Sequence, residues 1–375
     1  MLLPFPINPG LEDFPVYQPG RPIEEVAREL GLPSEDIIKL ASNENPLGPS
    51  PAALAAMRKV IDNINLYPDG NAFYLRQRLS QKLDIGPDHL ILGNGSNEII
   101  EFVGHALLSF DSKEFARSES PEVIVSQYCF AVYPLVARLF NATLITVPAL
   151  NYGHNLQAML KAVTPRTRII FIANPNNPTG TFISSAELSR FVNEVPERVL
   201  VVLDEAYIEF LPAAPDFVPL LRAGRKQNLL LMRTFSKIYG LAGLRVGYGI
   251  GARELIGALE KVRQPFNLNS LAQAAALAAL DDVEHIQNTL GNNSLGLTFY
   301  AEAFRKLNLQ FIPSAANFML VRVGNGQQIF EKLQQSGIIV RPMGGYQLPE
   351  WIRISIGTPV QNERCLEALK TALGR

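Results

Sequence analysis

The chain has 375 residues, of which 47% are hydrophobic and 18% are charged, and its net charge at pH 7 is −1. This length favours two or more packed units over one small core. The near-neutral charge argues against nucleic acid or an anionic membrane as a partner, and no apolar stretch is long enough to span a bilayer.

The first 48 residues are rich in proline and turn residues, and they predict an arm with one short amphipathic helix near Ile23–Leu30. From there on, short apolar runs alternate with helical patterns, which is typical of a mostly parallel sheet covered by helices on both faces. Helices are predicted near Pro51–Asn63, at Ser96–Leu108 and over Tyr133–Phe140. Strands are predicted at Leu90–Leu92, Val123–Val125, Thr143–Val147, Arg168–Ile172, Val199–Leu203, Leu229–Met232 and Val246–Gly249.

The pattern changes near Asp281. A long helix near Val283–Leu307 precedes three apolar runs, at Phe318–Val321, Gly337–Val340 and Trp351–Ser355. The sequence therefore predicts an α/β fold, with a seven-stranded type of sheet in a large domain and a smaller α+β domain. We expect residues 1–48 to form the arm and part of the small domain, 49–280 the large domain, and 281–375 the small C-terminal domain.

Cysteine and histidine placement gives no indication of a metal centre. Cys129 and Cys365 are far apart and have no Cys-x-x-Cys partner, which is typical of buried thiols in a reducing compartment. The four histidines lack metal-ligand spacing, so we expect no metal. The N-terminus has no basic region followed by a long apolar run, so we expect no signal peptide and a cytoplasmic location.

The most informative residue is Lys237, which lies in the segment Thr234-Phe235-Ser236-Lys237-Ile238-Tyr239-Gly240. Lysine forms Schiff bases with carbonyl cofactors. Ser236 and the nearby Arg245 are suited to bind an anion beside it, and a phosphate is the obvious candidate. The alternative is a surface lysine on an ordinary turn. It is disfavoured because three other segments supply the rest of one cofactor site.

These three segments follow predicted strands, where ligands bind in such sheets. The run from Gly93 to Glu98 opens a helix and suits a phosphate, but it fails as a nucleotide fingerprint, and a plain βα turn is its alternative. Asn174–Gly180 is a rigid turn with more amides than a turn requires, so one amide is a candidate ligand donor. Asp204 and Tyr207 suit the ring nitrogen and phenolate oxygen of one ligand, because a carboxylate keeps a pyridine nitrogen protonated. For Asp204, a helix cap is the alternative.

Taken together, the segments resemble the pyridoxal-phosphate-dependent aminotransferases of fold type I and, more narrowly, the histidinol-phosphate aminotransferase family. The narrower resemblance rests on Asn-Glu-Asn-Pro at 43–46 and Tyr-Pro-Asp at 67–69. The resemblance covers nearly the whole chain, through Ala41–Pro46, Tyr67–Gly70, Gly95–Glu98, Asn174–Gly180, Asp204–Tyr207, Thr234–Lys237, Gly243–Gly247 and Arg353–Gly357.

The resemblance implies a role for each matching residue. Lys237 would carry the cofactor and later move a proton, Asp204 would pair with the ring nitrogen, and Asn177 and Tyr207 would bond the ring hydroxyl. Tyr67 would reach the phosphate of the neighbouring subunit, which implies a homodimer. The other phosphate ligands implied are Gly95, Ser96, Asn97, Thr234, Ser236 and Arg245, and the substrate-binding residues implied are Tyr17, Asn43, Arg341 and Arg353.

One segment departs from the family pattern. The family has a Pro-Thr-Tyr string after the third strand, with its tyrosine stacked on the cofactor ring, whereas this chain reads Ser126-Gln127-Tyr128-Cys129-Phe130. Aligning the following Val132-Tyr133 with the family's Met-Tyr puts Phe130 on the ring. Phenylalanine stacks as well as tyrosine, and Tyr128 remains the alternative.

The implied reaction is transamination of L-histidinol phosphate with 2-oxoglutarate, giving imidazole-acetol phosphate and L-glutamate in histidine biosynthesis, with ping-pong kinetics. The first alternative is an aromatic amino-acid aminotransferase. An imidazole and a phenyl ring are similar in size, and a hydrophobic pocket discriminates weakly between groups of similar size. A lyase acting on an amino-acid phosphate is more distant. A sensor domain of a transcription regulator is disfavoured by the neutral charge, and a nicotinamide dehydrogenase by the failed glycine fingerprint.

Overall fold

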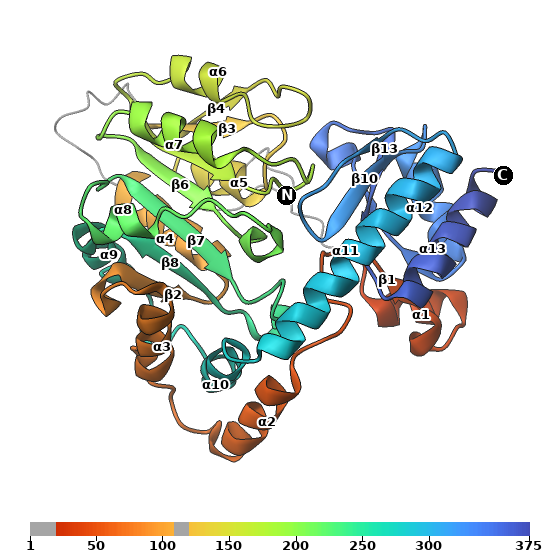
Figure 1. Ribbon diagram of the computed structural model, residues 1–375, viewed down its shortest axis with the longest axis horizontal. Coiled ribbons are helices and arrows are strands. Elements are labelled where there is room, and N and C mark those ends of the chain that lie inside the picture. Colours follow the sequence, from red (N-terminus) through yellow and green to blue (C-terminus); the bar gives the residue numbers. More distant parts are fainter. Residues whose placement is uncertain (1–19, 109–119) are drawn as a thin grey trace, which may run out of the picture.

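The computed structural model describes residues 20–108 and 120–375. The chain forms a larger part around a seven-stranded sheet and a smaller part around a four-stranded sheet. The long helix α11 (Val283–Lys306) extends from the larger part to the smaller one (Figure 1). This arrangement confirms the predicted α/β fold with a smaller α+β part, whereas the exact boundaries at residues 48 and 280 stay a prediction.

The larger sheet has the strand order β2-β8-β7-β6-β5-β3-β4. β8 is antiparallel to both of its neighbours, and the other neighbouring strands are parallel. The sheet is therefore mostly parallel, as predicted. Its strands are β2 (Leu90–Gly93), β3 (Glu122–Ser126), β4 (Thr143–Val147), β5 (Thr167–Ala173), β6 (Leu200–Asp204), β7 (Leu229–Thr234) and β8 (Gly247–Gly251).

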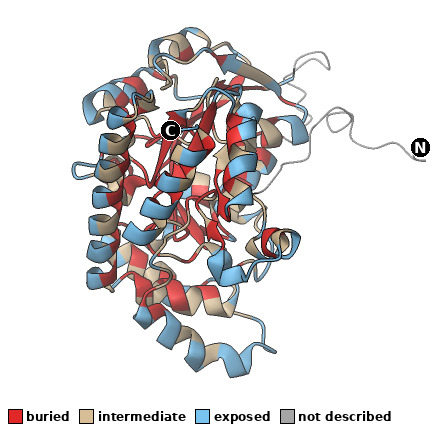
Figure 2. Ribbon diagram, turned by 90° about the vertical axis from the view of Figure 1, so that its right-hand side faces the viewer, coloured by how far each residue is buried: buried red, intermediate tan, exposed pale blue. Residues whose placement is uncertain are grey.

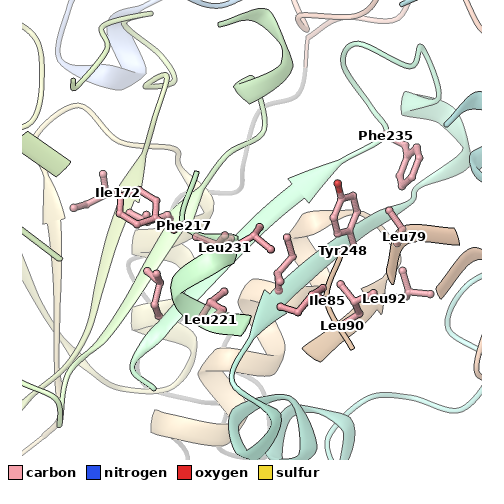
Figure 3. Packing of buried hydrophobic residues seen from close by; sticks show 14 of the residues in the cluster. Leu79, Ile85, Leu90, Leu92, Ile172, Phe217, Leu221, Leu231, Phe235 and Tyr248 are labelled. Carbon is pink, nitrogen blue, oxygen red and sulfur yellow. The ribbon is translucent and has the colours of Figure 1, made fainter. Parts of the chain in front are cut away.

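Both faces of this sheet are covered. Successive residues of β5 belong to different apolar clusters, Ile170 to one and Phe171 to the other, because side chains alternate along a strand. Figure 3 shows part of the first cluster, where Leu231 of β7 lies near Phe217. The covering helices are α2 (Pro51–Val60), α3 (Phe73–Leu83), α4 (Ser96–Leu108), α5 (Val132–Leu139), α6 (Leu156–Lys161), α7 (Ser185–Glu194), α8 (Val218–Arg222), α9 (Arg253–Glu260) and α10 (Ser270–Ala279).

The smaller part joins the two ends of the described chain. Its antiparallel sheet has the order β12-β13-β10-β9, and β1 near the N-terminus pairs in parallel with β11 near the C-terminus. The described segment that contains β1 therefore packs with the C-terminal segment. The elements are α1 (Ile23–Leu30), β1 (Ile38–Lys39), β9 (Phe311–Ile312), β10 (Phe318–Arg322), α12 (Gly326–Gln335), β11 (Ile338–Ile339), β12 (Arg341–Pro342), β13 (Trp351–Ser355) and α13 (Pro359–Ala372).

Several helices were not predicted from the sequence, although two of them carry clear start signals. α7 begins with a capping box between Ser184 and Glu187, and α13 with one between Thr358 and Gln361. Each box satisfies two backbone groups at the helix start, so this spacing was a usable signal. The short 3₁₀ turns are η2 (Ser34–Asp36), η3 (Ile61–Asn63), η4 (Pro87–His89), η5 (Ile208–Phe210), η6 (Ala242–Leu244) and η7 (Gly344–Tyr346).

Burial follows the layers of the fold. Figure 2 shows buried residues concentrated in the sheets and on the inner sides of the helices, with exposed residues on the outer sides. Within residues 20–108 and 120–375, no helix combines the length and the apolar character needed to cross a bilayer.

Candidate functional site

Most of the predicted site residues that the structure describes gather along one edge of the large sheet. The parallel strands β5, β6 and β7 end at this edge. The antiparallel β8 begins there, because Gly247 pairs with Thr234 at the end of β7 and with Gly93 at the end of β2. The loops after four strands and the loop before β8 therefore converge, which is where open α/β sheets bind their ligands.

A cavity of about 270 Å³ lies at this edge. The structure thus brings together segments that are far apart in the sequence, including both arginines expected from the smaller part. Of the predicted site residues, the cavity is lined by Asn43, Ser96, Asn97, Phe130, Asn177, Asp204, Tyr207, Thr234, Ser236, Lys237, Arg245, Arg341 and Arg353. It is also lined by residues to which the sequence analysis assigned no individual role, namely Gly20, Ser42, Glu44, Ala173, Pro175, Ala206, Ala242 and Tyr346.

Lys237 follows β7 and points its amine into the cavity. Its Nζ donates to the main-chain oxygens of Ser42 at 3.3 Å and Asn43 at 3.4 Å. Burial lowers the pKa of Lys237 to about 8, and the positive charges of Arg353 and Arg245 act in the same direction. The amine therefore gives up its proton more readily than an ordinary lysine, as a nucleophile or base requires.

Asp204 stands at the end of β6 and is 5% exposed. Its Oδ2 accepts a hydrogen bond from the Tyr133 hydroxyl at 2.6 Å, and its Oδ1 accepts one from the Ala206 amide at 3.1 Å. Burial raises the pKa of Asp204, while these two donors and the positive charge of Lys237 oppose that rise. Asp204 is therefore an oriented carboxyl group and not a helix cap.

Tyr207 and Asn43 connect the two parts of the fold. Asn43 Nδ2 donates to the Tyr207 hydroxyl at 2.9 Å, and the Asn43 side chain and amide both bond the hydroxyl of Ser355 on β13. Burial raises the pKa of Tyr207 to about 12, so its hydroxyl keeps its proton near neutral pH. Ser355 had not been singled out from the sequence, because its alternation pattern indicates only a strand residue.

An anion-binding cradle lies at the other side of the cavity. Arg245 Nη1 donates to the Ala242 carbonyl at 3.1 Å and to Ser236 Oγ at 3.4 Å, and Thr234 Oγ1 donates to Ser236 Oγ at 3.0 Å. The 13-residue helix α4 begins beside them at Ser96. A guanidinium, hydroxyls and a helix N-terminus together suit a phosphate.

Gly95 makes this arrangement sterically possible. It has a φ of 77°, and a Cβ added to it would lie 2.3 Å from Arg245 Nη2. Gly95 is itself not among the residues lining the cavity, although its neighbours Ser96 and Asn97 are. Glycine at position 95 therefore has a physical reason, which is the close approach of Arg245 to the start of α4.

The two arginines lie on neighbouring strands of the small sheet. Arg341 on β12 is the register partner of Arg353 on β13. Arg353 is 5% exposed, and it donates through Nη1 to Asn177 Oδ1 at 2.7 Å and through Nη2 to the Ala41 carbonyl at 3.0 Å. Like charges in paired positions repel, so their shared position at the cavity suits an anionic ligand.

The two candidates for stacking on a ligand ring occupy different places. Phe130 lines the cavity, and its ring meets the edge of Tyr133 at a centroid distance of 5.7 Å. Tyr128 packs instead toward Tyr152, with ring centroids 6.0 Å apart, and it is not among the residues that line the cavity. This placement favours Phe130 for the stacking role, which remains a prediction.

Besides Gly95, one described residue among the predicted ones, Tyr67, does not line the cavity. Tyr67 is 81% exposed and stacks on Phe266 at a centroid distance of 4.7 Å. An exposed position is what a residue reaching a second subunit needs, but the role stays a prediction. Tyr17 lies outside the described residues.

The side chains that line the cavity fit pyridoxal phosphate. The amine of Lys237 and the carboxylate of Asp204 line the same cavity as the aromatic face of Phe130 and the cradle around Arg245. Gly95 leaves room for the Arg245 guanidinium beside the start of α4, where a Cβ would clash with it. Among the described residues, no three His, Cys, Asp or Glu side chains are grouped so as to hold a metal.

Comparison with known proteins gives consistent results. Residues 35–369 match the family model of aminotransferase class I and II. The chain is 49% identical to a histidinol-phosphate aminotransferase of Akkermansia muciniphila, covering 98% of both chains, and 48% identical to one of Nitrosococcus oceani, covering 97% of this chain and 96% of the relative. Among solved structures, histidinol-phosphate aminotransferase from Sinorhizobium meliloti in complex with pyridoxal 5′-phosphate is similar with a TM-score of 0.87 and 27% identity, covering 98% of this chain and 97% of that one.

Proposed function

The chain belongs to the class I and II aminotransferases, and on that premise we propose that it catalyses the transamination of L-histidinol phosphate with 2-oxoglutarate, a step of histidine biosynthesis. Relatives of this name are 46–49% identical over nearly the whole chain. The reaction is dependent on pyridoxal phosphate. When bound, this cofactor supplies a carbonyl group that condenses with amines and a ring that accepts negative charge from the adjacent carbon.

Lys237 is proposed to hold the cofactor and to move the substrate proton. Its lowered pKa, about 8, means that a useful fraction of the amine is unprotonated near neutral pH. Once an incoming amine takes its place, the Lys237 amine lies close to the substrate's α-carbon and acts there as a base. Within the same half-reaction the amine would deliver that proton to the cofactor carbon that had carried the carbonyl group, and the second half would use the same transfer in reverse.

Three groups are proposed to bind and orient the cofactor. Asp204 would accept from the protonated ring nitrogen, and Phe130 would cover the ring. Asn177 and Tyr207 would bond the ring hydroxyl. The cradle formed by Arg245, the hydroxyls of Thr234 and Ser236, and the α4 start at residues 95–97 holds the phosphate.

The single observation that carries the substrate assignment is the pairing of Arg341 with Arg353 at the cavity that contains Lys237. Histidinol phosphate has a phosphate where glutamate has its α-carboxylate. One guanidinium fork binds either group in a bidentate manner, and a second guanidinium adds the charge that a phosphate dianion requires. Asn43 is proposed to line the same substrate pocket, as is Tyr17.

A half-reaction tests this assignment. The cofactor-loaded protein is mixed with L-histidinol phosphate or with L-phenylalanine, and the visible absorbance of the lysine-bound cofactor is followed. Faster loss with histidinol phosphate is expected, and an Arg341→Met variant should slow that reaction more than the reaction with glutamate. Faster loss with phenylalanine would instead assign the chain to aromatic amino-acid transamination.

We also propose that the active unit is a homodimer. Exposed apolar side chains gather in residues 61–74 and at Phe266, where Ile64 is 63% and Tyr67 81% exposed. A surface this apolar is typical of a protein–protein contact. We further propose a cytoplasmic location, since both cysteines are free and buried.

A further inference from the structure

Tyr133 makes the shortest contact to Asp204 and has no role in the reaction described so far. It lies on α5 and has no exposed surface. Its hydroxyl donates to Asp204 Oδ2 at 2.6 Å. Its ring lies parallel to that of Phe171, with centroids 4.6 Å apart and an interplanar angle of 3°.

The phenol is held firmly in this place. Phe171 of β5 stacks on one face of the ring, and Phe130 meets it at 83° with centroids 5.7 Å apart. A buried ring between two aromatic partners has little freedom to turn. The direction in which its hydroxyl points is therefore set by the packing of α5 on the sheet.

The two oxygens of Asp204 are each fixed by one donor from the protein. Oδ2 has the Tyr133 hydroxyl, and Oδ1 has the Ala206 amide at 3.1 Å. An ionised carboxylate has about four acceptor positions, so both oxygens keep acceptor capacity for a group in the cavity that Asp204 lines. Rotation of the carboxyl group would break both bonds.

We infer that Tyr133 is a positioning residue that keeps Asp204 ionised and aimed at the ring nitrogen of the cofactor. The inference rests on the proposed cofactor site. It adds the residue that holds the Asp204 carboxylate in the state and direction needed to bond the ring nitrogen.

The physical reason lies in the burial of Asp204. Burial raises the pKa of this carboxyl group, and the bond from Tyr133 counteracts that rise. Burial also raises the pKa of Tyr133 well above its usual value, so the phenol remains a donor and never competes as an anion. Without this donor, the proton shared between carboxylate and ring nitrogen moves toward the carboxylate. A ring nitrogen without its proton is a weaker acceptor of charge.

Tyr133→Phe tests the inference because it removes the hydroxyl and keeps the stacked ring. The matched control is Tyr300→Phe, which alters a fully buried tyrosine of the smaller part that stacks on Phe304 at 5.4 Å. Both variants are loaded with pyridoxal phosphate carrying a ¹⁵N label in the ring. The ¹⁵N resonance reports ring protonation, and titration of the cofactor-free proteins gives cofactor affinity.

For Tyr133→Phe we expect the ¹⁵N resonance to move toward that of the neutral ring, and kcat to fall about 10-fold or more, the range for losing a hydrogen bond to a charged group. The KM for 2-oxoglutarate should stay within about twofold, since no substrate contact is lost. Tyr300→Phe should leave the resonance and kcat as in the wild type. Phe171→Leu, which keeps the hydroxyl but removes the stacked ring, should lower stability and shift the resonance less than Tyr133→Phe does.

A wild-type resonance together with wild-type kcat in Tyr133→Phe would overturn the inference. An equal shift in Tyr300→Phe would do the same, because it would assign the effect to general loosening of the fold. If the wild-type protein took up no cofactor at all, the proposed function would itself fall, and the inference with it. A shift confined to Tyr133→Phe supports the positioning role.

Discussion

Replacing Gly95 by alanine should weaken cofactor binding, and the structure separates two causes of the damage. The first is backbone strain. Gly95 has a φ of 77°, and an alanine held in the left-handed region costs about 1–2 kcal/mol. This strain lowers the free energy of unfolding whether or not a cofactor is present.

The second cause is a steric clash with Arg245. The new Cβ would lie 2.3 Å from Nη2 and 2.9 Å from Cζ, whereas carbon contacts are optimal at about 3.5–4.0 Å. The guanidinium must therefore move by roughly 1 Å, which disturbs its bonds to the Ala242 carbonyl and Ser236. Losing one charge-assisted hydrogen bond to the phosphate costs about 1.5–3 kcal/mol, so cofactor affinity should fall about 10- to 150-fold.

Gly224→Ala is the matched control. Gly224 has a φ of 63°, and nothing lies within 4 Å of a Cβ placed on it. Urea unfolding of the cofactor-free proteins should show similar losses of stability in both variants. Fluorescence titration with pyridoxal phosphate should show weakened binding only in Gly95→Ala. Equal affinities in the two variants would refute the assignment of the cradle to the phosphate.

Three further predictions concern charge and assembly. Lys237→Met should stabilise the cofactor-free protein at pH 7 by about 3 kcal/mol. Burial lowers the pKa of Lys237 from 10.5 to about 8, so the unfolded chain binds more protons between these values and wild-type stability rises with pH there. The advantage of the variant in urea unfolding should shrink as pH rises from 8 to 10.5, and a constant advantage would contradict the argument. Arg353→Lys should lower kcat/KM for both substrates about 10-fold or more, because lysine cannot keep the fork to Asn177 and Ala41 and bind an anion as well; steady-state rates unchanged from the wild type would exclude this role. Ile64→Glu should convert dimers to monomers in analytical ultracentrifugation, since it puts a charge into the exposed apolar surface. An unchanged dimer mass would show that this surface is not the dimer interface.

Much of the large sheet was predictable, because strands that are buried on both faces consist of nearly continuous runs of apolar residues. Runs such as Arg168–Ile172 and Val199–Leu203 are apolar at nearly every position, and β5 and β6 lie there. Residues directly after such runs, like Asp204, lie at the ligand-binding edge of the sheet. The positions of Lys237 and Asp204 in the cavity thus follow from local sequence patterns and a general rule of sheet architecture.

Other features depend on which elements become neighbours. Tyr133 and Asp204 are separated by 71 positions, and Asn43 and Ser355 by 312. Periodicity shows that a side chain is buried but not which partner it meets. The same limit applies to Phe130 and Tyr128. The sequence favoured Phe130 and kept Tyr128 as the alternative, and in the fold Phe130 lines the cavity whereas Tyr128 packs toward Tyr152.

The sequence by itself determined the sheet type, the lysine, the strand-end carboxylate and the resemblance to aminotransferases, because burial and turn chemistry are local properties of the chain. The tertiary structure alone decided how three side chains meet their neighbours. The antiparallel β8 brings Arg245, which the sequence already offered as an anion ligand, beside Ser236. Arg341 pairs in register with Arg353, and the Tyr133 hydroxyl bonds Asp204. Each of these depends on strand direction, register or helix packing, which are set by contacts between distant segments.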